Sequence, residues 1–274
     1  MKFSELVIII SKLNPEDGYE EIESEGTYLG VTIRNSLSDI ASYEDAFLIT
    51  DMRDVADEAK KLGVGFCVYL NEISKTSDFK DSLYMIDSLN NVGMGHIERM
   101  YQRFLNIPWH ILDTKRLSLD EMTVEDLDGI YGIYDDPMVA RLAGEPYYDR
   151  EKAIDYIKSY SEYQYRFYEY GIWLVREKVS GEIIGRAGIT GRAGYEKPEL
   201  GYVFAKRAWG KGYATEAIEA ILKYARDELC LDSINAFVIP ENAVSVHILK
   251  KFGFEEIKKV MLHDEEHIYM QLEL

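Results

Sequence analysis

Leu200-Gly-Tyr-Val-Phe204 is followed shortly by Ala208-Trp-Gly-Lys-Gly-Tyr-Ala-Thr-Glu-Ala217, and together they predict how the second half of the chain folds. The first segment is an apolar run with the length of a strand. The second is a glycine-rich turn that leads into a helix, because the apolar residues from Ala217 to Ala225 repeat at helical spacing. A strand, a glycine turn and a helix N-terminus form an anion cradle, in which backbone N–H groups converge and the helix dipole adds positive charge.

The glycines of this turn, Gly210 and Gly212, let a phosphate approach the backbone without meeting a Cβ atom. Their spacing is neither Gly-x-Gly-x-x-Gly nor that of a Walker loop, which needs Gly-Lys-Ser/Thr. Taken alone, the pattern is also compatible with an ordinary glycine-rich turn. The segments around it are therefore needed to decide between the two.

A second motif follows at a suitable distance. The apolar run Ser233-Ile-Asn-Ala-Phe-Val-Ile239 leads to Pro240-Glu-Asn-Ala-Val-Ser245, then to a helix reaching Lys251 and to Phe252-Gly-Phe254. The two motifs resemble motif A (Gln/Arg-x-x-Gly-x-Gly/Ala) and motif B (Asn-x-x-Ser, then a helix ending in Gly-Phe) of the GNAT superfamily of N-acetyltransferases. Trp209 stands in the Gln/Arg place, as in the RimJ/RimL-like branch. The resemblance covers residues 113–274 and implies a mixed, mostly antiparallel sheet flanked by helices and splayed where the cofactor enters.

This resemblance implies that acetyl-CoA is the co-substrate and that acetyl passes directly to a primary amine. The pyrophosphate of the cofactor is expected on the backbone of the glycine turn, the pantetheine amides on the strand before it, and the cofactor arm on Asn242. Lys206 and Arg207 could add positive charge; the alternative is a solvated pair of cations on a turn. The cofactor-binding residues are thus Tyr202, Val203, Phe204, Trp209, Gly210, Lys211, Gly212, Tyr213, Ala214 and Asn242.

Two residues are candidates for the chemistry, since the amine must lose a proton before it attacks the thioester and the thiolate must gain one as it leaves. Glu199 matches a position where several GNAT enzymes carry a catalytic glutamate; the alternative is a solvent-facing residue after Pro198. Leu249 stands where many of these enzymes carry a tyrosine acid. Ser245 matches the serine that the RimL-like branch offers instead; the alternative is a helix-capping role.

The first part of the chain, residues 1–110, lies outside that resemblance. We expect it to form a separate small α/β domain, with residues 111–274 as the second domain. Tyr28–Ile33, Ala46–Thr50 and Gly65–Leu70 are expected to be buried strands. Arg53–Leu62 has the pattern of an amphipathic helix that ends at Gly63. Strand, helix and strand with short connections indicate a parallel, Rossmann-like sheet.

This domain weakly resembles the haloacid dehalogenase (HAD) superfamily, in which a strand ends in a Gly-Asp-x-x-x-Asp-like motif before a helix. The corresponding run is Ile49-Thr-Asp-Met-Arg-Asp54, and Tyr84–Val92 is similar to the closing strand and turn. The nucleophile pair of that family is replaced by Ile10-Ser-Lys12, so we expect a non-catalytic regulatory or docking domain. Asp51 is interpreted as the N-cap of the next helix; the alternative is a Mg²⁺ ligand together with Asp54.

Composition restricts the partners. The 274 residues include 31 Lys and Arg against 49 Asp and Glu, a net charge of −18, which argues against a nucleic-acid partner. The 47% hydrophobic residues exclude a disordered chain. We expect a soluble cytoplasmic protein with neither a signal segment nor a membrane span, because the run Leu6–Ile10 is short and the two cysteines suit a reducing compartment.

Several questions stay open from the sequence. The amine acceptor is either a cationic small molecule or a peptide N-terminus, and a non-catalytic acyl-CoA-binding module is the alternative to an enzyme. No metal is expected, because His263 and His267 flank a predicted turn before a terminal strand. Tyr156, Tyr160, Tyr163 and Phe167 recur at helical spacing and predict a packing stripe, parts of which could line the acceptor site.

Overall fold

The computed structural model describes residues 5–18, 30–33, 36–38, 40, 42–80, 82–90, 92–143 and 149–274. The chain forms two compact units, Met1–Trp109 and His110–Leu274. Among the described residues, no helix combines the length and the hydropathy that a membrane crossing requires. Tyr28 and Leu29, which begin one of the expected strands, lie outside the described residues.

The N-terminal unit contains a five-stranded sheet in which every neighbouring pair is parallel, with the order β2-β1-β3-β4-β5. This is a doubly wound order, and its switch point lies between β1 and β3. Its elements are β1 Glu5–Ile9, β2 Gly30–Ile33, β3 Ala46–Thr50, α2 Arg53–Leu62, β4 Gly65–Tyr69, η2 Ser74–Thr76, β5 Met85–Ile86 and α3 Met94–Phe104. The predicted parallel sheet is confirmed.

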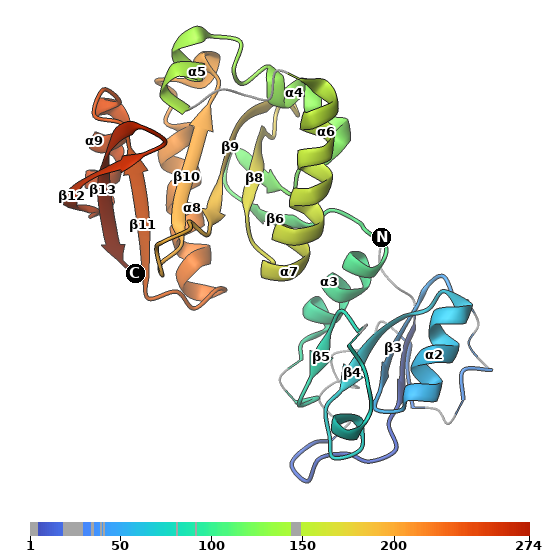
Figure 1. Ribbon diagram of the computed structural model, residues 1–274. Coiled ribbons are helices and arrows are strands. Elements are labelled where there is room, and N and C mark those ends of the chain that lie inside the picture. The colour runs from blue at the N-terminus through green and yellow to red at the C-terminus, as the bar shows by residue number, and fades with distance from the viewer. Residues whose placement is uncertain are drawn as a thin grey trace. The chain divides into compact units, whose positions relative to one another are not determined.

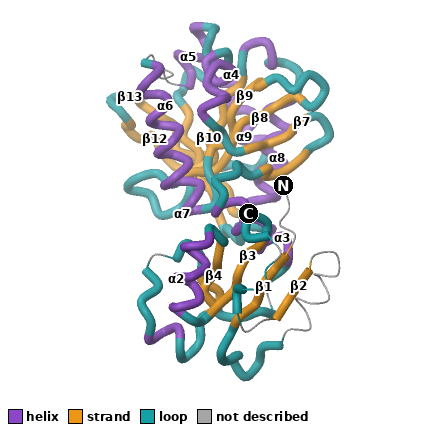
Figure 2. The backbone as a smooth tube through the Cα atoms, turned by 90° about the vertical axis from the view of Figure 1, so that its right-hand side faces the viewer, coloured by secondary structure: helices purple, strands orange, loops and turns teal. Residues whose placement is uncertain are grey.

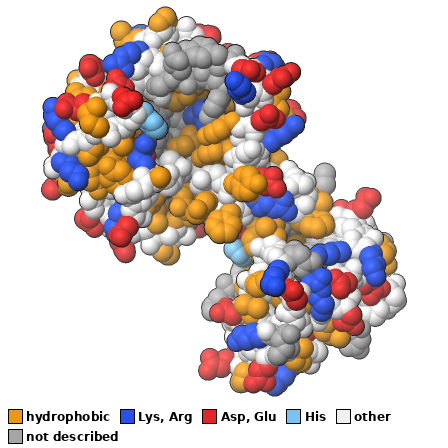
Figure 3. Space-filling view, viewed as in Figure 1, with side chains coloured by type: hydrophobic (Ala, Val, Ile, Leu, Met, Phe, Trp, Pro, Cys, Tyr) orange, Lys and Arg blue, Asp and Glu red, His pale blue; other side chains and the backbone are white. Residues whose placement is uncertain are grey.

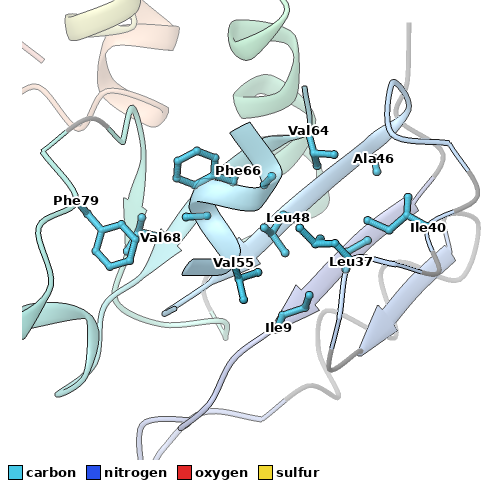
Figure 4. Packing of buried hydrophobic residues seen from close by; sticks show 13 residues of the cluster. Ile9, Leu37, Ile40, Ala46, Leu48, Val55, Val64, Phe66, Val68 and Phe79 are labelled. Carbon is cyan, nitrogen blue, oxygen red and sulfur yellow. The ribbon is translucent and has the colours of Figure 1, made fainter. Parts of the chain in front are cut away.

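Both faces of this sheet are covered, which explains why its strands are apolar without alternation. Leu48 and Ile9 lie on the side of the sheet that α2 covers and belong to one buried cluster with Val55 of that helix (Figure 4). Phe47 and Leu6 point the other way and pack against Ile97 and its neighbours on α3. Helix α2 ends at Gly63, whose φ of 74° is left-handed, as its C-cap role predicts.

Asp51 does not cap α2, so the capping prediction was wrong. The N-cap is Met52, which makes no side-chain hydrogen bond there. The Asp51 carboxylate is fully buried and accepts hydrogen bonds from the backbone N–H of Ser11 (2.8 Å) and Lys12 (3.2 Å), from Ser11 Oγ (2.6 Å) and from Asn71 Nδ2 (2.6 Å). It therefore joins the carboxyl ends of β1, β3 and β4. With four donors already on its two oxygens and Asp54 exposed on α2, this carboxylate is poorly suited to hold Mg²⁺.

Replacement of Asp51 by Ala is expected to lower the free energy of unfolding of the N-terminal unit by about 3 kcal/mol, because buried donors lose a charged acceptor. Asp54→Ala is the matched control. It removes an exposed carboxylate from the first turn of α2 and should cost less than about 1 kcal/mol. Urea unfolding of the full chain, with hydrogen exchange of residues 46–70, measures both. Equal costs for the two variants would contradict a structural role for Asp51.

The C-terminal unit contains an eight-stranded sheet of order β12-β13-β11-β10-β9-β8-β7-β6, antiparallel at every junction except β10–β11. The predicted mixed, mostly antiparallel fold is confirmed. Its strands are β6 His110–Asp113, β7 Leu117–Asp120, β8 Ile172–Glu177, β9 Ile183–Thr190, β10 Glu199–Phe204, β11 Ser233–Val238, β12 Glu255–Leu262 and β13 Glu265–Glu273. Its helical segments are η3 Val124–Asp126, α4 Leu127–Tyr131, α5 Pro137–Ala143, α6 Arg150–Ser159, η4 Tyr160–Tyr165, α7 Arg166–Tyr168, η5 Lys206–Ala208, α8 Tyr213–Asp227 and α9 Ala243–Lys251.

Strands β10 and β11 separate after their first residues, and this positions the site. They pair only at Glu199 and Asn235, whereas β10 pairs with β9 along its whole length. The two strands lie next to each other in the sheet in Figure 1, and Figure 2 shows helix α6 in front of its strands. Among the described residues, the β11-facing edge of β10 from Leu200 to Phe204 therefore has no strand partner, and its backbone groups can pair with a ligand.

The prediction of an aromatic packing stripe from Tyr156 to Phe167 is only partly correct. Tyr163 and Phe167 are 69% and 76% exposed, whereas Tyr165 is fully buried. The cause is the π-helical segment Tyr160–Tyr165, whose wider turn shifts the register of the following residues. The Tyr165 hydroxyl donates to the carbonyl of Ile172 (2.6 Å) and so fastens this segment to β8.

Candidate active site

A cavity of about 510 Å³ lies where the strand, turn and helix of the first motif meet. Of the expected cofactor-binding residues, it is lined by Tyr202, Val203, Phe204, Trp209, Gly210, Gly212, Tyr213, Ala214 and Asn242. Lys211 is exposed and is not among the lining residues. The Trp209 indole N–H donates to the Phe204 carbonyl (2.8 Å), and Lys206 Nζ lies 3.9 Å from the centre of the Trp209 ring.

The glycine turn has the geometry of an anion cradle. Gly212 is the N-cap of α8 with a φ of 78°, and no side chain caps the helix. The first N–H groups of a helix have no partner within it, so they are available to a phosphate. Gly210 also has a positive φ, 73°, and a Cβ atom there would meet nothing within 4 Å. Glycine is needed here for its backbone conformation rather than for space.

A cluster around Glu216 stabilises this turn, and no local sequence pattern predicted it. The Glu216 carboxylate accepts hydrogen bonds from Arg116 Nε (2.6 Å), from the Arg116 backbone N–H (2.8 Å) and from Thr114 Oγ1 (2.6 Å). Burial raises the pKa of Glu216, but the hydrogen bonds from Thr114 and Arg116 outweigh it, so this pKa lies below its usual value. Arg116 also donates to the Lys211 carbonyl (2.9 Å), and its guanidinium lies 4.4 Å from the Tyr213 ring centre.

The two other cations of the turn differ in what they contact. The Arg207 guanidinium donates to the carbonyls of Gly132 (2.9 Å) and Ile183 (2.8 Å), which ties the turn to β9 and to the end of α4. Lys206 keeps its ammonium group over the Trp209 ring at the rim of the cavity. Lys206 is therefore the better placed of the two to meet an anionic ligand.

A second and larger cavity, about 1170 Å³, adjoins the first between the separated strands. Figure 3 shows this face of the C-terminal unit hollowed, with hydrophobic side chains around the hollow. Its wall includes Glu199, Leu249, Tyr156, His263 and His267. Among the described parts of the chain, no cluster of three or more His, Cys, Asp or Glu side chains is arranged to hold a metal ion.

Glu199 faces this larger cavity and is not a solvent-facing residue, because only 7% of it is exposed. Arg192 donates to both carboxylate oxygens, through Nη2 to Oε1 (3.0 Å) and through Nε to Oε2. The Arg192 guanidinium also lies 4.9 Å from the Phe237 ring centre, so it is held from two sides. A carboxylate has about four acceptor positions, which leaves Glu199 able to accept from an amine or a water as well.

Ser245 does not act as the cap of α9, because Asn242 does. The Asn242 side-chain oxygen accepts from the Ser245 backbone N–H (3.1 Å). The Ser245 hydroxyl is instead paired with the hydroxyl of Tyr202 at 2.6 Å, and Ser245 is 8% exposed. Ser245 and Tyr202 line both cavities.

Comparison with known proteins identifies the family of the C-terminal unit. A family model for the acetyltransferase (GNAT) domain matches residues 116–255, which all lie in the C-terminal unit. The chain belongs to the GNAT family of acetyltransferases. It is therefore an N-acetyltransferase, an acyltransferase enzyme whose co-substrate is acetyl-CoA.

Named relatives are bacterial. The chain is 32% identical over 162 residues to the uncharacterized N-acetyltransferase p20 of Bacillus licheniformis, an alignment covering 57% of this chain and 86% of that protein. It is 31% identical over 150 residues to the uncharacterized N-acetyltransferase YoaA of Bacillus subtilis, covering 53% and 83%. The crystal structure of an acetyltransferase from Agrobacterium tumefaciens shares the fold, with a TM-score of 0.52, 24% identity and coverage of 60% and 94%.

Proposed function

We propose that the C-terminal unit acetylates the N-terminal amine of a peptide or protein, with Glu199 as the general base. Support comes from one arrangement: two adjoining cavities that share part of their walls, with the glycine turn at one and Glu199 at the other. Acetyl-CoA bound along the free edge of β10 would bring its thioester to the shared wall. An amine in the larger cavity would then lie between the thioester and Glu199.

The charges of the larger cavity favour a peptide over a polyamine. Two of the three carboxylates that line it are already paired with arginines, Glu199 with Arg192 and Glu265 with Arg141 at 2.7 Å, and the third, Asp135, is exposed to solvent. A polyamine carries several positive charges and gains most from carboxylates that lack such partners. A peptide has a single terminal amine and many neutral amide groups. It therefore needs only one carboxylate, and its amides can form hydrogen bonds with the paired charges of the wall.

In the reaction, the neutral amine attacks the thioester carbonyl carbon and its excess proton passes to Glu199, directly or through a water. The bidentate contact with Arg192 fixes the orientation of this carboxylate.

For the N-terminal unit we propose a non-catalytic docking domain, since its buried carboxylate Asp51 is fully engaged in hydrogen bonds. The unpaired thiols Cys67 and Cys230 support a reducing, cytoplasmic location.

Calorimetric titration of the full chain with acetyl-CoA, CoA and ATP tests the cofactor assignment, with micromolar binding of the first two expected and none of ATP. Thiol release with acetyl-CoA then compares a peptide bearing a free N-terminus with spermidine. We expect kcat/KM to be at least tenfold higher for the peptide, and the same peptide with a blocked N-terminus to be inactive. A preference for spermidine would contradict the proposed acceptor, and absence of acetyl-CoA binding would contradict the site itself.

A further inference from the structure

Six of the described residues line both cavities, and they mark where the reacting atoms must meet. They are Leu142, Ala143, Tyr202, Val203, Asn242 and Ser245. The acetyl carbonyl has to lie within bonding distance of the amine on one side and of the sulfur on the other. Transfer therefore takes place against this shared wall.

Only three of these residues carry polar side chains, and one is already used. The Asn242 oxygen holds the first turn of α9 through the Ser245 backbone N–H. The remaining polar groups are the hydroxyls of Tyr202 and Ser245, 2.6 Å apart. They face each other across the gap between β10 and α9, which come from the two separate motifs.

The acidities of the two hydroxyl groups indicate which of them donates the hydrogen bond. A phenol is a much stronger acid than an aliphatic alcohol, and Ser245 Oγ (2.6 Å) lies closer to the Tyr202 hydroxyl than the Ser245 carbonyl oxygen does (3.4 Å), so the favoured arrangement has Tyr202 donating to Ser245 Oγ. The Ser245 proton is then free to point elsewhere. Burial raises the pKa of Tyr202 to about 12, although the hydrogen bond with Ser245 lowers it, so the phenol keeps its proton at neutral pH.

We propose that Tyr202 is a positioning residue that orients the Ser245 hydroxyl, so that Ser245 donates its hydrogen bond to the thioester sulfur as the thiolate leaves. This inference rests on the proposed function. As the C–N bond forms and the C–S bond breaks, the bonding electron pair goes to sulfur. The proton of the amine passes to the base, and the thiolate takes a proton from water after it has left.

This arrangement accounts for Leu249, which stands where related enzymes carry a tyrosine acid. Leu249 is fully buried and lines the larger cavity, so α9 supplies no phenol at that position. The phenol comes from β10 and acts through Ser245. Its purpose is electrostatic stabilisation of the charge that develops on sulfur, as in an oxyanion hole.

Kinetics of Tyr202→Phe, Ser245→Ala and the double variant test the proposal with the peptide substrate. Tyr202→Phe should lower kcat about tenfold, with the KM and the Kd for acetyl-CoA within twofold of wild type. Ser245→Ala should lower kcat at least as much, and adding Tyr202→Phe to it should cost nothing more, because residues that act as a unit are not additive. Tyr269→Phe is the control, because the Tyr269 hydroxyl donates to Asn235 Oδ1 (3.0 Å) and Tyr269 lines neither cavity. Independent losses that multiply, or a Tyr202→Phe variant with unchanged kcat, would overturn the proposal.

A second measurement needs no acceptor. Because the Ser245 hydroxyl favours the thiolate over the thiol, wild-type protein should bind CoA several-fold more tightly at pH 10 than at pH 7, since a free thiol ionises near pH 8.5. Tyr202→Phe should lose this gain. If wild-type protein binds acetyl-CoA but acetylates no amine, the proposed function fails, and the CoA titration still decides the role of Tyr202. A wild-type CoA affinity that shows no gain between the two pH values would overturn that role.

Discussion

Replacement of Gly210 and Gly212 together by Val should weaken acetyl-CoA binding at least 100-fold. Both glycines have a left-handed φ, 73° and 78°, which costs other residues roughly 1–2 kcal/mol each. The loop would relax to negative φ and turn its amide groups away from the phosphates. A 100-fold loss corresponds to about 2.7 kcal/mol, so the backbone strain and the lost hydrogen bonds are together sufficient.

The fold should survive these replacements, because the added Cβ atoms meet little. Nothing lies within 4 Å of the Cβ position at Gly210, and the nearest atom at Gly212 is an Arg116 nitrogen at 3.6 Å. Gly181→Val is the matched control: its φ is 72°, nothing lies within 4 Å, and it sits in the turn between β8 and β9. Circular dichroism and calorimetry compare the variants. Binding within fivefold of wild type in the double variant would remove the turn from the cofactor site.

Local patterns predicted the elements well, because periodicity and glycine positions are local properties. Ala46–Thr50 and Arg53–Leu62 have the same bounds in the structure as in the sequence prediction, and Gly63 ends the helix in the left-handed conformation expected of it. The glycine turn was also located correctly between its strand and helix. In each case the residues that determine the element are neighbours in the chain.

Contacts between distant segments could not be predicted in this way. Arg116 is 100 residues from Glu216, and Tyr202 is 43 residues from Ser245. The sequence therefore assigned Tyr202 to the cofactor site through its backbone alone and missed its hydroxyl. The role of Asp51 could not be predicted for the same reason. Its hydrogen-bond donors come from the ends of two other strands, whereas the local sequence pattern indicated a helix cap.

Replacement of Glu199 by Gln should lower kcat/KM for the peptide by about 10²–10³-fold, the range expected for loss of a general base. The amide cannot take the proton of the attacking amine, yet it has nearly the volume of the carboxylate. Its oxygen can still accept one hydrogen bond from Arg192, so the loop between β9 and β10 should keep its place. The loss should appear in kcat rather than in the Kd for acetyl-CoA, since Glu199 does not line the cofactor cavity.

Glu196→Gln is the matched control for this prediction, because it makes the same chemical change three residues earlier at an exposed position. Its kcat/KM should stay within twofold of wild type. Steady-state rates of both variants from pH 6 to pH 10, with calorimetric acetyl-CoA affinities, separate loss of the base from loss of structure. If Glu199→Gln keeps full kcat across this range, the proton must leave by another route, and the ion pair with Arg192 would then serve to shape the acceptor cavity rather than to accept the proton.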